Sequence, residues 1–384
     1  MTASALTQPG ERERFAVKLK SIDWTFSLAL AAIAVAGGAM LFSIDGVKWA
    51  PWAAPHLALF AACFLAMIVL ATVDLRIWFA LAYPIYAAGL ALLAAVAVIG
   101  RSSNGAKRWL DLGPLHIQPS EIVKVGLVLA LARFYHVRSA KTAHLSWRLL
   151  IPAFLIGAPA ALVARQPDLG TAVLIAATGG AMMVLAGLSL RIIVLGLAGL
   201  AAAIPAAFLF VLKGYQKARL LSFSHPEADR SGSGWHIIQS EIALGSGGLL
   251  GKGFGLGTQS ALNFLPEKQT DFIFASLAEE FGFIGCATVL LLYATVIFIG
   301  FRIAATAHSH FGRLAAAGVT STFALCVLIN GAMVMGLAPV VGVPMPLLSY
   351  GGTVMISMMV GFGLVLAVRV HRYSEVGSGR SGLL

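Results

Sequence analysis

Long apolar stretches alternate with short polar segments along most of the chain. Runs of about 17 to 25 apolar residues predict membrane-spanning helices. Ten such stretches lie near 23–43, 55–73, 77–99, 119–135, 148–164, 170–188, 191–212, 272–301, 314–337 and 351–370. The fourth carries Glu121 and Lys124 and the fifth contains Pro152 and Pro159, but neighbouring helices can satisfy a backbone that proline breaks. The pattern therefore predicts an all-α polytopic membrane protein with about ten transmembrane helices.

Composition supports the bilayer as the solvent. Of the 384 residues, 59% are hydrophobic and 11% are charged, about half the charged share of a soluble globular chain. Cys63, Cys286 and Cys326 lie inside apolar runs and form no CxxC pair. We interpret them as small buried hydrophobic residues rather than disulfide or metal ligands.

The distribution of Lys and Arg predicts the orientation. Most of these residues in short loops fall on the side of the N-terminus, which the positive-inside rule assigns to the cytoplasm. Both ends, 1–22 and 371–384, are then cytoplasmic. The large loop at 213–271, between the seventh and eighth helices, is periplasmic, and 1–384 forms one membrane domain. The net charge of +11 is spread over many loops, which favours lipid headgroups over nucleic acid as partners.

The first segment with candidate chemistry precedes the fourth helix. Glu121 and Lys124 lie three residues apart on one helical face and could pair where water is scarce. They form either a structural ion pair or a charged wall of a substrate cavity. Arg108, beside Trp109, is either an interfacial anchor or a phosphate contact. A second segment, 165–171, contains Asp168, which is well placed as a helix N-cap.

The large loop contains a glycine-rich segment at 245–257, called the glycine loop below. This segment does not match the nucleotide-binding Walker motif, because Ser246 occupies the first glycine position and Gly253 the Ser/Thr position. Two interpretations stay open: backbone amides that cradle a pyrophosphate, or a tightly turning loop.

A carboxylate stands where the large loop re-enters the membrane. Asp271 directly precedes an apolar helix, so it is either an N-cap or a general base whose pKa is tuned by partial burial. Glu279 and Glu280 lie deeper in that helix and should face a polar interior. The uncharged, proline-rich segment 339–352 is expected to shape the rim of a cavity.

These segments together resemble one known family. The motifs are GAKRWLDLG followed by QPSEIVK, QPDLGTA, YQKARLLSF, GSGGLLGKG, GTQSALNFLPEKQTDFIF and PMPLLSYGG. In this order they resemble the SEDS family (shape, elongation, division and sporulation) over nearly the whole chain. The rod-shape branch fits better than the division branch.

The resemblance implies a glycosyltransferase that polymerises lipid II at the periplasmic face of the bacterial inner membrane. It also implies a complex with a class B penicillin-binding transpeptidase and other elongation proteins. The family's loop aspartate falls on Asp271, the expected general base. Positive side chains should hold the leaving pyrophosphate; the candidates are Arg108, Arg219, Lys107 and Lys252. Glu121, Lys124 and Glu279 would line the cavity or brace it as structural pairs, and a divalent cation (Mg or Mn) is left open.

Two other classes of function remain. A flippase that moves lipid II would use intramembrane charges such as Glu121, Lys124 and Glu279, but it needs a path to both faces of the membrane. A non-catalytic scaffold would not explain a carboxylate and basic residues gathered on one outward side.

Overall fold

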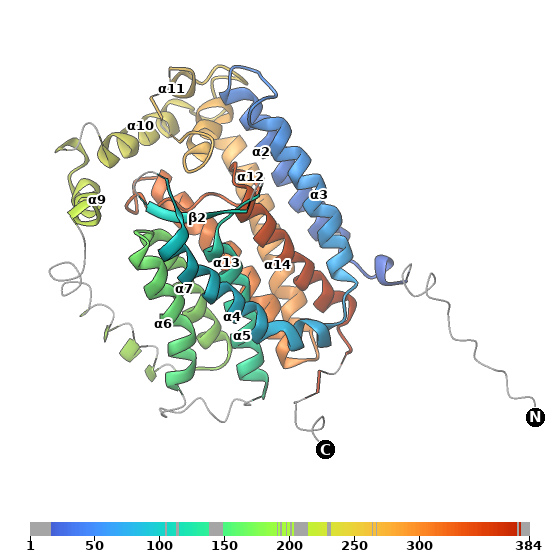
Figure 1. Cartoon of the computed structure of the whole chain (residues 1–384). Coiled ribbons are helices and arrows are strands. Elements are labelled where there is room, and N and C mark those ends of the chain that lie inside the picture. Colours follow the sequence, from blue (N-terminus) through green and yellow to red (C-terminus); the bar gives the residue numbers. More distant parts are fainter. Residues whose placement is uncertain are drawn as a thin grey trace, which may run out of the picture.

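The structure is a helical bundle with a loop-rich end (Figure 1). This computed structural model describes residues 17–377 apart from 104–105, 113–114, 138–148, 190, 193, 197, 200–201, 203–213, 229–231, 263, 266 and 375. Within these residues, six helices are long and apolar enough to cross a membrane: α2 (Trp24–Ile44), α3 (Ala53–Ala71), α4 (Leu75–Ile99), α12 (Ile273–Thr306), α13 (His310–Val334) and α14 (Gly352–Val370). They confirm a multi-pass, largely helical protein.

Three further helices complete the described bundle: α5 (Pro119–Val137), α6 (Leu150–Arg165) and α7 (Leu169–Leu185). They match the expected fourth, fifth and sixth spans. Most of the expected seventh span, 191–212, falls outside the described residues. The total of ten spans and the cytoplasmic location of both ends therefore stay predictions.

Helix α13 lies inside the bundle, and its small and aromatic residues are buried along most of its length. Phe323 contacts the rings of both Tyr293 and Phe362, with centroids 5.4 and 5.1 Å away. Phe362 in turn packs edge-on against Phe26 at 5.4 Å. Such pairs add about 0.5–1.5 kcal/mol each beyond area burial. They join α2, α12, α13 and α14 into one core.

Helices α2 and α12 are tied together at both ends. At one end Arg302 Nη2 lies 2.8 Å from Asp23 Oδ2, and Asp23 also caps α2 by accepting a bond from the Phe26 amide. At the other end the Ser43 hydroxyl donates to the carboxylate of Glu280 at 2.7 and 2.6 Å. The two contacts fix the relative height of the two helices.

A small antiparallel sheet interrupts the all-helical pattern. Strands β1 (Arg101–Ser103), β2 (Ala106–Leu112) and β3 (Leu115–Ile117) follow α4 in the order β1-β2-β3. The sequence analysis did not predict them, because a hydropathy window reads only spans. A chain segment outside the helices must still pair its backbone polar groups, and here Leu110 pairs with Ile117 across β2 and β3.

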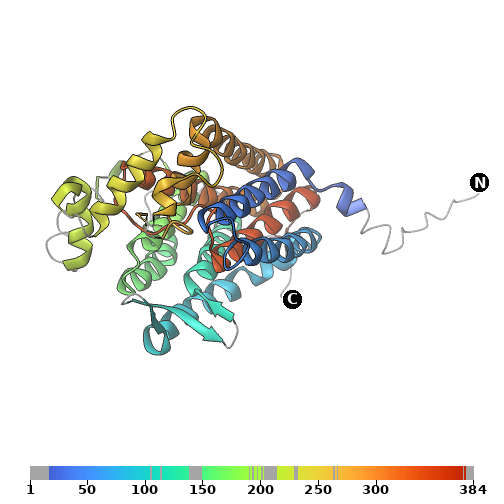
Figure 2. The ribbon, with the colours of Figure 1, turned by 90° about the horizontal axis from the view of Figure 1, so that it is seen from above.

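The large loop is helical rather than irregular. It contains α9 (Gly214–Ser224), the 3₁₀ turn η3 (Pro226–Ala228), α10 (Ser233–Ser246) and α11 (Thr258–Ala261). Figure 2, seen from above, shows α9 and α10 beyond one edge of the bundle and the sheet over another. The loop thus covers one side of this end.

The glycine loop forms backbone hydrogen bonds with α12 at a break in that helix. At Gly282 the backbone has φ 61° and ψ −158°, which is not helical. Just before the break, the carbonyls of Glu279 and Glu280 accept bonds from the amides of Lys252 and Gly253, each at 3.0 Å. These two amides are therefore engaged within the protein, and the structure supports the tightly turning interpretation of this loop.

The loop also completes the helix after the break. The amides of Phe283 and Ile284 donate to the carbonyls of Gly248 and Leu249 at 2.9 and 3.1 Å. Gly251 has φ +80°, and a methyl group there would overlap the backbone of α12. Glycines are needed here because two backbones meet with no room for side chains.

Candidate functional site

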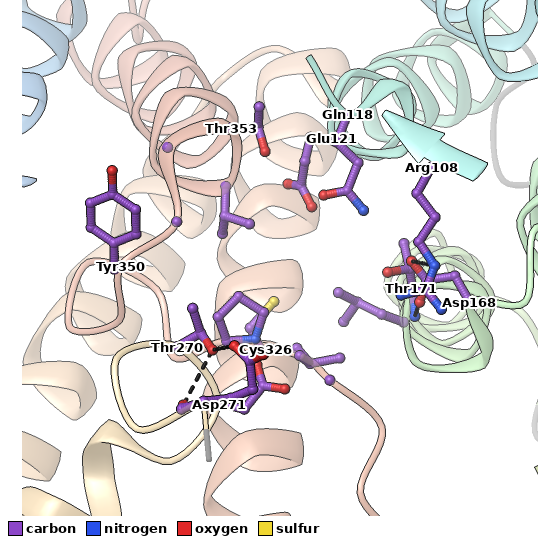
Figure 3. A pocket seen from close by; sticks show the side chains of 18 of the residues that line it. Arg108, Gln118, Glu121, Asp168, Thr171, Thr270, Asp271, Cys326, Tyr350 and Thr353 are labelled. Carbon is purple, nitrogen blue, oxygen red and sulfur yellow. Dashed lines mark hydrogen bonds and ion pairs between the residues drawn. The ribbon is translucent and has the colours of Figure 1, made fainter. Parts of the chain in front are cut away.

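A cavity of about 570 Å³ opens at the loop-rich end of the bundle. Its walls come from β2, the first turns of α5 and α7, the segment before α12, and the segment between α13 and α14. The described lining comprises Trp52, Arg108, Trp109, Gln118, Glu121, Lys124, Asp168, Thr171, Leu174, Glu267, Gln269, Thr270, Asp271, Cys326, Val341, Gly342, Val343, Pro344, Tyr350, Gly351, Gly352, Thr353 and Val354. Figure 3 shows Arg108 and Asp271 on different walls, with Gln118 and Glu121 on a third. Ligand pockets commonly have volumes of about 300–1,000 Å³.

Asp271 lies at the cavity wall just before α12. Its amide donates to the Glu267 carbonyl at 3.1 Å, and its own carbonyl accepts from Asn330 Nδ2 at 2.9 Å. The N-cap residue of α12 is Phe272, which makes no side-chain capping bond. Asp271 therefore does not occupy the capping position that was the alternative to a chemical role.

Asn330 is a site residue that the sequence analysis missed. It is fully buried in α13, and its side-chain amide also donates to the Val343 carbonyl at 2.8 Å. One side chain thus joins the segment of Asp271 to the adjacent 341–344 segment. The available signal was an asparagine within an apolar span, where a polar side chain is unfavourable without partners.

Arg108 lies beside the N-terminus of α7. Its guanidinium donates to the Gln166 carbonyl at 3.4 Å and to the Pro167 carbonyl, and Nε lies 3.9 Å from Asp168 Oδ2. Asp168 accepts a bond from the Thr171 amide at 3.2 Å, so its predicted capping role is confirmed. The Arg108 side chain is one-third exposed. An exposed guanidinium next to a helix N-terminus can bind an anion.

Glu121 and Lys124 form the expected ion pair. Their charged atoms are 2.8 Å apart, each side chain is 5% exposed, and Ser357 donates to the second Glu121 oxygen at 2.7 Å. Both residues also line the cavity, so the two interpretations of the pair are compatible. Lys124 also lines a separate small space of about 10 Å³ among the described residues, room for about one water molecule.

Lys252 and Glu279 form a second pair outside the cavity lining. Lys252 Nζ lies 2.6 Å from the fully buried Glu279 carboxylate, which also accepts from the Thr258 amide at 2.9 Å and from its hydroxyl at 2.8 Å. The pair fastens the glycine loop to α12. The side chains of Lys107 and Arg219, the other two cationic candidates, lie outside what the structure describes.

The sequence predicted basic residues and a carboxylate together on one side, and on the described lining carboxylates outnumber cations. The carboxylates are Glu121, Asp168, Glu267 and Asp271, and the cations are Arg108 and Lys124. Among the described residues, no three His, Cys, Asp or Glu side chains are grouped to hold a metal ion.

Comparison with known proteins identifies the family. The model of the FtsW, RodA and SpoVE family, described as cell cycle protein, matches residues 24–374. The chain belongs to this family. It is 43% identical over 351 residues to the peptidoglycan glycosyltransferase MrdB of Escherichia coli strain K12, covering 91% of this chain and 94% of that protein. Stage V sporulation protein E of Bacillus subtilis is 38% identical over 288 residues, covering 74% and 77%.

Solved structures of family members share the fold. A structure described as "Structural coordination of polymerization and crosslinking by a peptidoglycan synthase complex" matches with a TM-score of 0.80 and 32% identity, covering 92% of this chain and 99% of that chain. The crystal structure of the rod shape determining protein RodA of Thermus thermophilus matches with a TM-score of 0.69 and 32% identity, covering 92% and 98%. The rod-shape branch inferred from the motifs agrees with these relatives.

Proposed function

We propose that this membrane protein polymerises lipid II into glycan strands during cell elongation, with Asp271 as general base. The class of enzyme, a peptidoglycan glycosyltransferase, is that of its relatives. Support for the finer assignment comes from one observation. The Asp271 carboxylate and the Arg108 guanidinium line the same cavity, and that cavity is large enough for saccharide units.

The reaction is written as one inverting displacement. The 4-hydroxyl of the acceptor GlcNAc attacks the anomeric carbon of the donor MurNAc, and the bond from that carbon to the pyrophosphate oxygen breaks. The hydroxyl proton passes to Asp271, and undecaprenyl pyrophosphate leaves with the bonding electron pair. An α-linked donor thereby becomes a β-glycoside, so no protein nucleophile is required.

Positive charge near the leaving group lowers the barrier, because charge develops there in the transition state. Arg108 is the described cation best placed for this role, since it is partly exposed at the cavity and held beside the α7 N-terminus. Lys124 is committed to Glu121. Arg219 and Lys107 remain candidates on the basis of the sequence alone. The rings of Trp52 and Tyr350, 4.9 Å apart at the cavity, provide apolar faces for sugar rings.

Two isosteric variants test the base. Purified protein, in complex with its transpeptidase, would be given lipid II, and glycan length would be measured for Asp271→Asn and Glu267→Gln. Glu267 is the matched control, because its carboxylate lines the same wall. Removing a positioned base costs about 10²–10⁴-fold in rate. We expect that loss for Asp271→Asn in an intact complex and near-normal chains for Glu267→Gln. The reverse pattern would refute the assignment.

The flippase alternative has less support in this conformation. A transporter needs a route to both membrane faces, whereas the buried Glu121–Lys124 pair lines the cavity and the separate space that Lys124 and Ser357 line has a volume of only about 10 Å³. Transfer of fluorescent lipid II across vesicles by the purified protein, together with no glycan formation, would favour the flippase. A complex with no activity in either assay would favour a scaffold.

The proposal also specifies the orientation of the protein in the membrane and its partner. The cavity end faces the periplasm of the inner membrane, and the partner is a class B penicillin-binding transpeptidase. Support for such a partner comes from the similar structure described as a peptidoglycan synthase complex. Labelling of an introduced cysteine at the exposed Glu227 in intact cells, by a reagent that does not cross the membrane, tests the orientation. Absence of labelling would reverse it.

A further inference from the structure

The glycine loop carries large apolar side chains that nothing in the described chain covers. Leu249, Leu250 and Leu256 are 70%, 78% and 63% exposed, although this loop lies outside the predicted spans. We propose that the glycine loop re-enters the bilayer, with its leucines in contact with lipid acyl chains of the leaflet on the cavity side. This role is separate from the glycosyltransferase chemistry.

The two side-chain contacts between α2 and α12 indicate where the bilayer boundaries lie along these helices. The 21 residues of α2 span about 30 Å at 1.5 Å per residue, which equals the hydrocarbon thickness of a typical bilayer. The Asp23–Arg302 pair lies at one end of this length, and the Ser43–Glu280 bond lies at the other. The Ser43–Glu280 bond therefore marks the level of the hydrocarbon boundary on the cavity side.

The glycine loop reaches that level. The Lys252 and Gly253 amides donate to the carbonyls of Glu279 and Glu280, and the carbonyls of a helix point toward its C-terminal end, so the two amides lie on the bilayer side of these carbonyls. The amides of Phe283 and Ile284, which follow the break at Gly282, donate to Gly248 and Leu249. The loop backbone is therefore inserted into the break in α12 at the hydrocarbon boundary, where an exposed leucine contacts acyl chains.

The exposed surface of the loop continues the lipid-facing surface of α12. Phe283, Ile284, Leu291 and Phe298 are exposed along that helix by 66%, 53%, 68% and 68%. Phe254 of the loop packs against the rings of Phe42 and Phe281, with centroids 6.3 and 6.1 Å away. Loop, α2 and α12 thus share one apolar face.

The Lys252 and Gly253 amides and the Lys252 ammonium have partners within the protein, which allows the loop to lie in lipid. A segment in hydrocarbon must satisfy its backbone internally, and the α12 break pairs the amides of Lys252 and Gly253 with helix carbonyls. Lys252 is the one charged residue of the sequence 247–257, and its ammonium pairs with Glu279. The charge is thereby neutralised at the bilayer edge.

Depth-dependent quenching tests the proposal. The full-length chain, with Cys63, Cys286 and Cys326 replaced by alanine, would carry one bimane-labelled cysteine and be reconstituted in phosphatidylcholine vesicles with or without brominated acyl chains. Leu250→Cys and Leu256→Cys probe the loop. Leu291→Cys, in the exposed middle of α12, is the lipid control, and Glu227→Cys, in the exposed turn η3, is the aqueous control.

We expect brominated lipid to quench the Leu250 and Leu256 labels to an extent comparable with Leu291, and aqueous iodide to quench the Glu227 label alone. Quenching of both loop labels by iodide without quenching by brominated lipid would place the loop in water. Protection from both quenchers would mean that protein, either a partner or a second copy, covers the loop. Either result overturns the proposal, and thermal unfolding of each labelled variant verifies its fold.

Discussion

Asn330 holds Asp271 by its backbone rather than by its carboxylate. The Asn330 side-chain amide donates to the carbonyls of Asp271 and Val343 at 2.9 and 2.8 Å from a fully buried position in α13. The backbone contact fixes the position of Asp271 while leaving the carboxylate to other interactions. The two segments it joins lie side by side on the cavity lining, where a Cβ at Gly342 would be 3.5 Å from Asp271 Oδ2.

Replacing Asn330 by leucine should therefore weaken both the fold and the reaction. Two buried carbonyls lose their donor, at a cost of about 1–3 kcal/mol each, and Asp271 loses its support. We expect a lower melting temperature and a fall in kcat for lipid II polymerisation that exceeds any change in KM. Thr322→Val is the matched control, because its buried hydroxyl bonds only within α13. Equal effects on kcat in the two variants would contradict a positioning role.

The burial of the Glu121–Lys124 pair predicts that removing the cation alone destabilises the protein more than removing both charges. Lys124→Met leaves a buried carboxylate without its cation, which destabilises a protein by about 3–5 kcal/mol. Adding Glu121→Gln should recover much of the loss, because the uncompensated charge disappears. Thermal unfolding in detergent measures each variant.

An exposed pair provides the comparison for these variants. Arg302 is 54% exposed where it meets Asp23, and exposed pairs contribute about 0–1 kcal/mol. Arg302→Met should therefore change the melting temperature little. A loss as large as that of Lys124→Met would show that burial does not decide the difference.

The close backbone contact between the glycine loop and α12 predicts that glycine is required at position 251. Gly251→Ala places a methyl group against the backbone of α12 at a φ of +80°, and left-handed backbone costs a non-glycine residue about 1–2 kcal/mol before any overlap. We expect reduced thermal stability and faster proteolysis within the glycine loop. Gly245→Ala is the control, since open space surrounds that position in α10, and it should be neutral or stabilising. A stable Gly251→Ala variant would mean that the loop is not held against α12.

His371, which lies outside the predicted spans, predicts a loss of folding stability at acidic pH. Burial lowers the pKa of His371 below its usual 6.5, although a bond to the Ala367 carbonyl opposes the shift. The unfolded chain therefore binds a proton at a higher pH than the folded chain. Stability should fall as the pH drops below about 6.5 and level off below the folded pKa.

The measurement is the melting temperature between about pH 5 and 8. His371→Gln should flatten the decline that the parent protein shows, because it removes the group that titrates differently in the two states. His308→Gln removes an exposed imidazole at the same end of the bundle and is the control. An unchanged slope in His371→Gln would exclude this histidine as the cause.

The sequence alone determined the features that depend on short stretches of chain. Membrane spans are recognisable because about 20 consecutive apolar residues are needed to cross a bilayer. The cap at Asp168 was predictable because the capping carboxylate and its donor, the Thr171 amide, are three residues apart. The Glu121–Lys124 pair followed from one helical turn, and the family followed from motifs distributed along the chain.

Tertiary structure alone decided which distant groups meet. Sequence could not decide whether Asp271 is the N-cap of α12, a position that Phe272 occupies in the structure. Nor could it show that Asn330, 59 residues away, donates to the Asp271 carbonyl. Nor could it assign Lys252, because the position of this cation is set by Glu279 and by a break in another segment. The reason is physical: hydropathy and capping are local properties, whereas these contacts exist only after helices far apart in the chain have packed.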